Sequence, residues 1–164
     1  MKNRNLNHSN NWKTPNSLYS ILDDEFHFDF DPCPYNEKEI ILPHEDGLLI
    51  DWGYMNFVNP PYSIKLKEAF VKRAIEFKLE GKFSVLLLPV STSTKLFHDH
   101  ILPNANEIRF LYGRPSFQNK NNIKNKGMHD SMIVTLLENQ KTKLIVKSLR
   151  FPNNNFERVA RRKK

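Results

Sequence analysis

The 164-residue sequence is poor in cysteine and glycine, and it has no long apolar run. Its single cysteine, Cys33, cannot form an internal disulfide, which favours a reducing cytoplasm as the location of the protein. No apolar stretch reaches the length of a transmembrane helix and the N-terminus lacks a signal-peptide pattern, so no membrane partner is expected. No glycine stands before Gly47, so the first part of the chain contains no glycine-rich phosphate-binding loop.

Metal-ligand spacings are also missing from the sequence. His98 and His100 are separated by one residue, and the other histidines and Cys33 do not complete a zinc-binding pattern. No serine, histidine and aspartate occur in an order typical of a catalytic triad. The sequence therefore predicts neither a metal site nor a hydrolase of that kind.

The chain does contain enough apolar side chains for one hydrophobic core. Hydrophobic residues make up 39% of the sequence and aromatic residues 12%, and a chain of this length is typical of a single domain. Residues 1–11 are polar and rich in asparagine, which predicts a flexible N-terminal arm. We expect the folded domain at 12–150 and a basic C-terminal tail at 151–164.

The net charge of the chain is +7, and its isoelectric point is about 9.5. Such a basic protein favours a polyanionic partner such as nucleic acid. Four of the basic residues are the last four of the chain, 161–164, where a solvated terminus explains them equally well.

Helical and strand patterns alternate along the chain and place it in the α/β class. Residues 26–31 alternate aromatic and polar side chains as a strand does, and the apolar run at 83–90 is typical of a central strand covered on both faces. Apolar residues at helical spacing predict a helix at 64–82. This pattern predicts a mixed, twisted sheet flanked by helices in a compact single domain.

The remaining elements follow from caps, turns and shorter runs. Thr14 is expected to cap a helix in which Pro15 is the first residue. The other expected elements are a short strand at 40–43, a helix at 95–102, a strand at 107–112, a loop at 118–128, and a hairpin formed by 131–137 and 143–149.

One stretch carries the chemistry of the chain. The short apolar segment 56–58 runs directly into Asn59, Pro60, Pro61 and Tyr62. A residue before proline is driven into an extended conformation, and two prolines remove two backbone donors, so the corner is stiff and its free groups are acceptors. The Asn59 side-chain oxygen and the Pro60 carbonyl can therefore accept two hydrogen bonds from one planar amino group. Tyr62 adds an aromatic face for a planar base.

Two acceptors on one amine have a chemical consequence. The lone pair of an exocyclic amine is delocalised into its ring, which makes the nitrogen a poor nucleophile. Holding both N–H groups favours a pyramidal nitrogen that can attack a methyl group. The alternative for the tetrapeptide is a proline-rich turn without chemistry.

The tetrapeptide resembles the Asn/Asp-Pro-Pro-Tyr motif of S-adenosylmethionine-dependent amino-methyltransferases. Together with its flanking motifs, the chain resembles the compact phage-type DNA adenine methyltransferases from Trp12 to Leu137. The flanking motifs are Trp12, Thr14-Pro15, Asp31-Pro32, Asp46-Gly47-Leu48, Asp51-Trp52 and Gly113-Arg114. The resemblance implies a Rossmann-like methyltransferase fold, S-adenosylmethionine as cofactor, DNA as partner, and transfer to the exocyclic amine of an adenine flipped out of the duplex.

The resemblance also implies roles for individual residues. The catalytic residues would be Asn59, Pro60, Pro61 and Tyr62. The cofactor would be held by Trp12, Thr14, Pro15, Asp31, Pro32, Asp46, Leu48 and Asn59. The substrate would be contacted by Tyr62, Ser63, Arg114, Lys120, Lys124 and Lys126.

Several alternatives stay open at the level of sequence. Thr14 and Pro15 can be a helix cap alone, Asp51 rather than Asp46 can meet the cofactor adenine, and 118–128 can be a surface insertion rather than a DNA contact. The same motif serves RNA adenine, cytosine-amine and protein-glutamine methylation. The missing glycine turn also allows an inactive nucleic-acid-binding relative, and a small-molecule-binding Rossmann-like module is a third class. The recognition sequence and the oligomeric state are not predicted.

Overall fold

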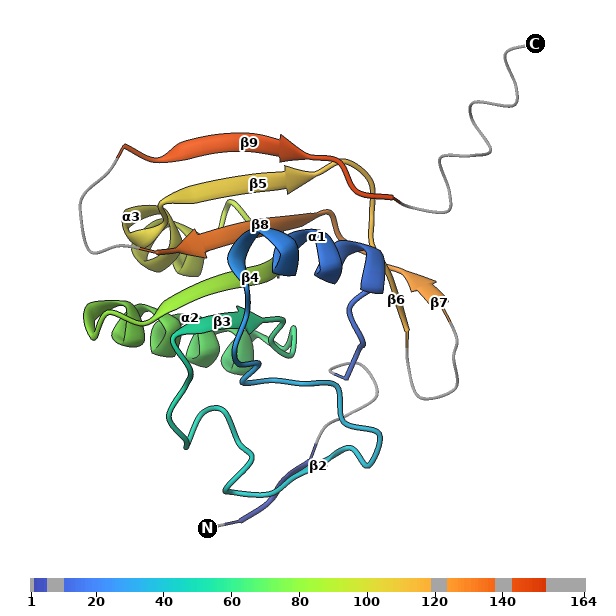
Figure 1. The fold of residues 1–164 in the computed structure, drawn as a ribbon, viewed down its shortest axis with the longest axis vertical. Coiled ribbons are helices and arrows are strands. Elements are labelled where there is room, and N and C mark those ends of the chain that lie inside the picture. The colour runs from blue at the N-terminus through green and yellow to red at the C-terminus, as the bar shows by residue number, and fades with distance from the viewer. Residues whose placement is uncertain (1, 6–10, 119–123, 138–142, 153–164) are drawn as a thin grey trace.

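A computed structural model describes residues 2–5, 11–118, 124–137 and 143–152. Its centre is a five-stranded sheet with the order β3-β4-β8-β5-β9 (Figure 1). The strands are β3 (Met55–Val58), β4 (Phe83–Pro89), β8 (Ser131–Leu136), β5 (Glu107–Leu111) and β9 (Ile145–Leu149). Strand β8 is antiparallel to both of its neighbours, whereas β3 pairs with β4 and β5 with β9 in parallel. The sheet is therefore mixed, as predicted.

Helices cover both faces of this sheet. Helix α1 (Asn16–Phe26) buries Leu18 and Leu22 against one face, where they join a cluster with Val85 and Leu87 of β4. Helix α2 (Ile64–Leu79) buries Phe70 and its helical neighbours against the other face. Successive side chains of β4 point to opposite faces of the sheet, so its apolar run contributes to the hydrophobic clusters on both faces. The prediction of a central strand covered on both sides is confirmed.

The predicted helix at 64–82 is also confirmed, with an earlier end. Its apolar positions Phe70, Ala74 and Phe77 are buried, as the 3.6-residue period requires. Gly81 follows the helix with a φ of 81°, a left-handed conformation that favours glycine and stops the helix.

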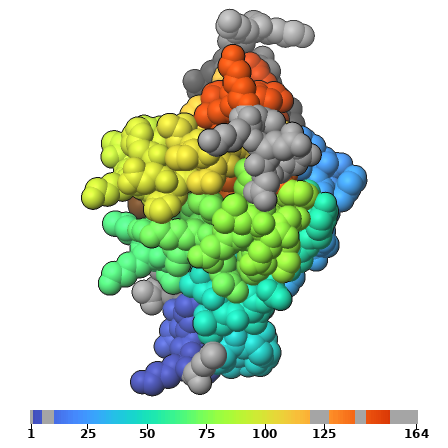
Figure 2. Space-filling view, turned by 90° about the vertical axis from the view of Figure 1, so that its left-hand side faces the viewer, coloured from blue at the N-terminus to red at the C-terminus, as the bar shows by residue number. Residues whose placement is uncertain are grey.

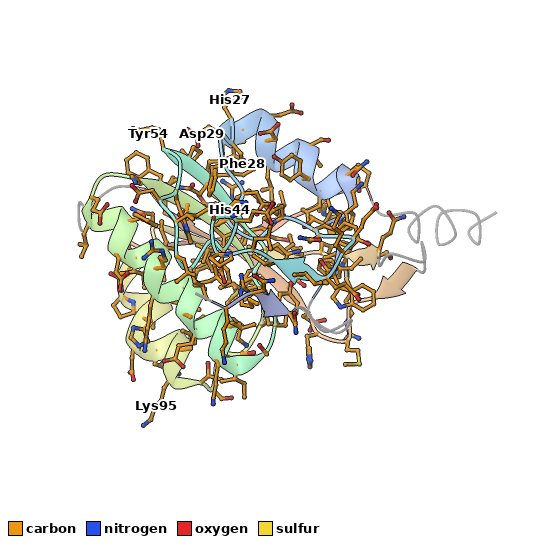
Figure 3. The ribbon with its side chains drawn as sticks, turned by 90° about the horizontal axis from the view of Figure 1, so that it is seen from below. His27, Phe28, Asp29, His44, Tyr54 and Lys95 are labelled. Atoms are coloured by element: carbon orange, nitrogen blue, oxygen red, sulfur yellow. The ribbon has the colours of Figure 1, made fainter. Side chains whose placement is uncertain are left out.

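The expected strand at 26–31 does not form. Phe26 is the last residue of α1, and His27 closes that helix in the left-handed region with a φ of 55°. Of the expected strand, Phe30 makes a single parallel bridge to Asn56. The Asp29 carboxylate, which lies beside Tyr54 in Figure 3, accepts the backbone N–H groups of Tyr54 and Met55 at 3.1 Å each. A side chain thus replaces part of the strand ladder.

The N-terminal arm, expected to be loose, contains a strand. Strand β1 (Arg4–Asn5) pairs antiparallel with β2 (Ile40–Ile41) in a separate two-stranded sheet. The predicted strand at 40–43 therefore exists but does not join the main sheet. Figure 2 shows the N-terminal residues and the region around β2 at the same end of the molecule. At the other terminus, Phe151, assigned by sequence to the tail, is buried in the α1-side cluster.

Two further predictions in the second half of the chain were wrong. Residues expected to form a loop at 118–128 instead contribute to a hairpin of β6 (Ser116–Gln118) and β7 (Lys124–Lys126). Strands β8 and β9 do not form a hairpin with each other, because β5 lies between them. Sequence periodicity identifies strands, but it does not reveal that a third strand lies between two strands that follow each other in the sequence.

The helix expected at 95–102 is irregular. It consists of a π-helical segment, η2 (Leu96–Ile101), followed by a short helix, α3 (Leu102–Asn104). Phe97 N donates to Thr94 Oγ1 at 3.3 Å, although the N-cap residue of the segment is Lys95. None of the helices described is long and apolar enough to cross a membrane.

Candidate functional site

The tetrapeptide Asn59-Pro60-Pro61-Tyr62 connects the end of β3 to the start of α2. The Asn59 side chain is held by its amide nitrogen, which donates to Thr14 Oγ1 at 3.0 Å and approaches the Trp12 carbonyl oxygen at 3.5 Å. These contacts occupy the donor end of the carboxamide. They leave Oδ1 as the end that can accept a hydrogen bond from a ligand.

Thr14 therefore has a different role from the expected cap. Pro15 occupies the N-cap position of α1, and no side chain caps that helix end. The segment around Thr14 is also fixed from its other side, because Lys13 and Gln118 exchange backbone hydrogen bonds of 2.8 and 3.2 Å. The prediction that Thr14 caps α1 was wrong, and its proximity to the tetrapeptide is a finding of the structure.

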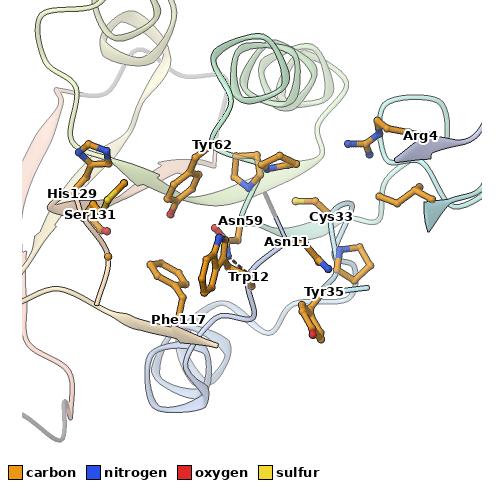
Figure 4. Close-up of a pocket in the computed structure, with 16 residues that line it drawn as sticks. Arg4, Asn11, Trp12, Cys33, Tyr35, Asn59, Tyr62, Phe117, His129 and Ser131 are labelled. Atoms are coloured by element: carbon orange, nitrogen blue, oxygen red, sulfur yellow. Dashed lines mark hydrogen bonds between the residues drawn. The ribbon is translucent and has the colours of Figure 1, made fainter. Parts of the chain in front are cut away.

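Two adjoining cavities meet at Asn59. The larger has a volume of about 580 Å³ and the smaller about 220 Å³. Both are lined by Trp12, Cys33, Tyr35 and Asn59. In Figure 4, Asn59, Trp12 and Tyr62 lie in the middle of the larger cavity, with Arg4 at one end and His129 at the other. Cavities of this combined size with a partly aromatic lining are typical of small-molecule sites.

Tyr62 supplies an aromatic wall to the larger cavity. Its ring meets the edge of Phe117 in β6 at a centroid distance of 6.2 Å and an interplanar angle of 86°, a favourable aromatic geometry. Its hydroxyl oxygen is buried and has no hydrogen-bond partner within the described residues, and burial raises the pKa of Tyr62 well above its ordinary value. The segment that begins with the Gly113-Arg114 motif thus reaches the site through Phe117.

Asp31 lines the smaller cavity, together with Trp12, Thr14 and Asn59. Its Oδ1 accepts the backbone N–H of Cys33 at 2.9 Å. Burial raises the pKa of Asp31 to about 6 from the ordinary 3.8, against the lowering effect of the Cys33 hydrogen bond. A carboxylate in a cavity with a pKa raised by burial is typical of a group that awaits a charged partner.

Cys33 lies beside this carboxylate and lines both cavities. Burial, followed by the nearby Asp31 charge, raises the pKa of its thiol well above the ordinary value. A thiol held in its neutral form is a poor nucleophile, so Cys33 acts as part of the apolar wall.

Asp46 is engaged elsewhere in the protein. Both of its carboxylate oxygens accept hydrogen bonds from the Arg4 guanidinium at 2.7 Å, and Oδ1 also accepts the Leu48 N–H at 2.9 Å. Neither Asp46 nor Leu48 lines the two cavities. Asp51, the alternative acid, has an 87% exposed side chain and lies 3.5 Å from Lys82 Nζ. The assignment of either acid to a cofactor adenine stays a prediction.

The chain does bring the acid segments close together. A side chain at Gly47 would collide with the carbonyl oxygen of Pro32, so only glycine allows this approach. Trp52 Nε1 donates to the Gly47 carbonyl oxygen at 2.7 Å and fixes the same loop from behind. The Asp31-Pro32 and Asp46-Gly47-Leu48 segments are therefore neighbours, although only Asp31 faces a cavity.

The predicted substrate residues are spread more widely. Ser63 stands at the N-cap of α2, and Arg114 forms an exposed ion pair with Asp130 at 2.9 Å. Lys124 and Lys126 belong to β7, which pairs with β6 beside the cavity wall residue Phe117. Lys120 lies outside the described residues. Of the predicted cofactor residues, Pro15 and Pro32 do not line either cavity.

Sequence reasoning missed several residues that line the larger cavity. They are Arg4, Asn11, Pro34, Tyr35, Ile41, Met128, His129 and Ser131. Arg4 and Ile41 reach the cavity through the β1–β2 pairing, which no local sequence pattern predicts. Within the described residues, no three histidine, cysteine, aspartate or glutamate side chains could hold a metal ion.

Residues 2–161 match the family described as DNA N-6-adenine-methyltransferase (Dam). The chain belongs to the Dam family. The same comparisons find no matching curated protein and no matching solved structure. Dam membership supports methylation of adenine N6 in DNA as the broad activity, and it confirms the resemblance that the Asn59 tetrapeptide and its flanking motifs indicate.

Proposed function

We propose that this protein transfers a methyl group from S-adenosylmethionine to the exocyclic amine of a flipped-out adenine in DNA. The observation that carries the proposal is the position of Asn59, whose donor end is bonded to Thr14 while its side chain lines two adjoining cavities. One cavity suits a base and the other suits the charged part of a cofactor. The order of the strands, with antiparallel β8 between β4 and β5, supports a Rossmann-like methyltransferase fold.

The residues present fit the proposed cofactor. S-adenosylmethionine would supply an electrophilic methyl group on a sulfonium and would carry an ammonium that needs an acidic partner. Asp31 is the acid that faces the smaller cavity, and burial raises its pKa, as expected for a carboxylate without a cation beside it among the described residues. Trp12 and Tyr35 contribute apolar and aromatic surface at the boundary between the cavities.

The chain's own residues position the acceptor. Asn59 Oδ1 accepts one amine hydrogen and the Pro60 carbonyl oxygen accepts the other, which directs the nitrogen lone pair toward the methyl group. Tyr62 stacks on the extruded base, with Phe117 supporting the ring from its edge. Catalysis then rests on orientation and on acceptors fixed in advance. Bound S-adenosylmethionine would supply the methyl group to this nitrogen, with its sulfur leaving as the neutral thioether, and the nitrogen would afterwards release one proton to solvent.

A second reading, an RNA or cytosine-amine acceptor, shares the same chemistry. The test is to incubate the purified protein with cofactor labelled in its methyl group and with separate pools of DNA, RNA and protein. We expect label in DNA, and much less in the other pools. The Asn59→Ala variant is the control, because it removes the acceptor and leaves both cavities in place. Equal labelling of DNA by that variant would contradict the role of Asn59. Labelling of RNA alone would show that the methyl acceptor is RNA and not DNA.

A further inference from the structure

The contact between Asn59 and Thr14 joins residues that are 45 positions apart in the sequence. The Thr14 hydroxyl accepts from Asn59 Nδ2 at 3.0 Å, and the Trp12 carbonyl oxygen lies 3.5 Å from the same nitrogen. Thr14 caps no helix, because Pro15 takes that position without a side-chain hydrogen bond. The hydroxyl of Thr14 is therefore directed to the tetrapeptide rather than to α1.

This contact decides which end of the Asn59 carboxamide faces a ligand. The two ends of an asparagine side chain have almost the same shape, but one accepts hydrogen bonds and the other donates them. An amine that must give up its N–H groups needs the oxygen. If the amide were turned by half a rotation, its NH₂ group would face the N–H groups of the acceptor. The Trp12 carbonyl oxygen can only accept, so it rejects that turned arrangement.

The positions of these partners are fixed by the fold. The backbone of Lys13, between Trp12 and Thr14, pairs with Gln118 of β6 through two hydrogen bonds. Asn59 itself follows the last residue of β3 and precedes Pro60, which restricts its backbone. The amide orientation is therefore set before a ligand enters the site.

We propose that Thr14 is a positioning residue that fixes the acceptor end of Asn59 and thereby makes the site selective for amino groups over carbonyl oxygens. The proposal rests on the methyltransferase function proposed above. It assigns specificity to a hydroxyl that does not need to touch the base. A carbonyl oxygen placed where the amine belongs would meet Asn59 Oδ1, which offers it no hydrogen.

The symmetry of a carboxylate provides a sharp test. Thr14→Val keeps the side-chain shape and removes the shorter of the two hydrogen bonds to Asn59 Nδ2, so that only the 3.5 Å contact with the Trp12 carbonyl oxygen orients the amide. We expect this weaker hold to lower kcat by about ten- to a hundredfold. In the Asn59→Asp variant both ends of the side chain are acceptors, so no orientation needs to be chosen. We therefore expect Thr14→Val to lower kcat much less in that variant than in the wild type. A purely structural role of Thr14 would give the same loss in both.

Three controls accompany this cycle. Thr14→Ser keeps the hydroxyl and should lower kcat much less than Thr14→Val does. The dissociation constant for S-adenosylmethionine, measured by calorimetry, should change much less than kcat in Thr14→Val, because the isosteric side chain keeps its packing. Thermal unfolding should show that each variant is folded under the assay conditions. If Asn59→Asp is inactive, or if Thr14→Val does not fold, the role of the Thr14 hydroxyl is tested by comparing kcat of the wild type with that of Thr14→Ser. A large loss of kcat in Thr14→Ser overturns the proposal.

The other outcomes separate this inference from the proposed function. Equal losses in the wild-type and Asn59→Asp backgrounds overturn the role of Thr14 and leave the methyltransferase function standing. A weaker cofactor affinity with unchanged kcat at saturation overturns it too, and makes Thr14 a cofactor contact instead. Wild-type protein without turnover on any amine acceptor overturns the proposed function and the role of Thr14 with it.

Discussion

Burial of the Asp31 carboxyl works against the stability of the folded protein. Its pKa is raised to about 6, compared with an ordinary 3.8, chiefly by burial. The folded protein therefore holds this proton more tightly than the unfolded chain does, so the free energy of unfolding falls as the pH rises from about 4 to 6. The difference between the two pKa values corresponds to up to about 3 kcal/mol of lost stability above pH 6.

The Asp31→Asn variant isolates this effect. Asparagine keeps an oxygen that can accept the Cys33 N–H, which lies 2.9 Å from Asp31 Oδ1, and it removes the charge. Urea unfolding at pH 8 should show the variant to be more stable than the wild type by up to about 3 kcal/mol. The gain should shrink between pH 6 and pH 4, where the wild-type carboxyl takes up its proton. Asp51→Asn is the matched control, because its 87% exposed side chain should give no gain of this kind.

The same change should weaken cofactor binding. If the ionised Asp31 binds the cofactor ammonium, only the ionised fraction of the protein is competent to bind. That fraction is about a tenth at pH 5, so the wild-type dissociation constant should be about tenfold higher there than at pH 8. The Asp31→Asn variant should bind weakly and without this pH dependence in calorimetry. A loss of stability in Asp31→Asn at pH 8 would contradict the cost assigned to burying the Asp31 carboxylate. A wild-type affinity for the cofactor that is independent of pH would contradict its role in binding the ammonium.

Three other predictions concern the tetrapeptide and the basic hairpin. Asn59→Ala should lower kcat by about a hundredfold or more with unchanged thermal unfolding, because it removes a fixed acceptor; wild-type turnover in that variant would contradict the assignment. Tyr62→Phe should leave turnover nearly unchanged and raise the free energy of unfolding by about 1 kcal/mol, since the hydroxyl is buried without a partner among the described residues. Tyr62→Ala should weaken base binding by about 1–3 kcal/mol in a fluorescence titration, and a severe loss in Tyr62→Phe would instead give the hydroxyl a role in the reaction. Neutralising Lys120, Lys124 and Lys126 together should reduce the slope of DNA binding with salt, d log K/d log [salt], by up to about three in magnitude, with cofactor affinity unchanged. An unaltered slope would show that this segment does not contact DNA.

The sequence predicted the elements with strong periodicity. Helix α2 follows from apolar residues at helical spacing such as Phe70 and Phe77, and β4 follows from one uninterrupted apolar run. Tyr62 and Asn59 could be identified because a proline pair constrains the backbone wherever it occurs. These signals are local, and local physics is what a sequence displays most directly.

The features that sequence missed depend on distant contacts. Arg4 bonds Asp46 across 42 positions, and Thr14 bonds Asn59 across 45. Thr14 before Pro15 satisfies the local rule for a helix cap, but the tertiary contact with Asn59 took precedence. The 26–31 segment likewise has the alternation of a strand, yet Asp29 uses its carboxylate to take the hydrogen bonds that a strand backbone would make.

The identity of the modified nucleoside is the most direct test of adenine N6 methylation by this protein. DNA incubated with the wild-type protein and S-adenosylmethionine would be digested to nucleosides and analysed by mass spectrometry against synthetic standards. We expect N6-methyl-2′-deoxyadenosine in amounts that increase with enzyme and time, and that are lower by about a hundredfold or more with Asn59→Ala. N4-methyl-2′-deoxycytidine in its place, or no methylated nucleoside from folded protein that binds the cofactor, would contradict the proposed methylation of adenine N6.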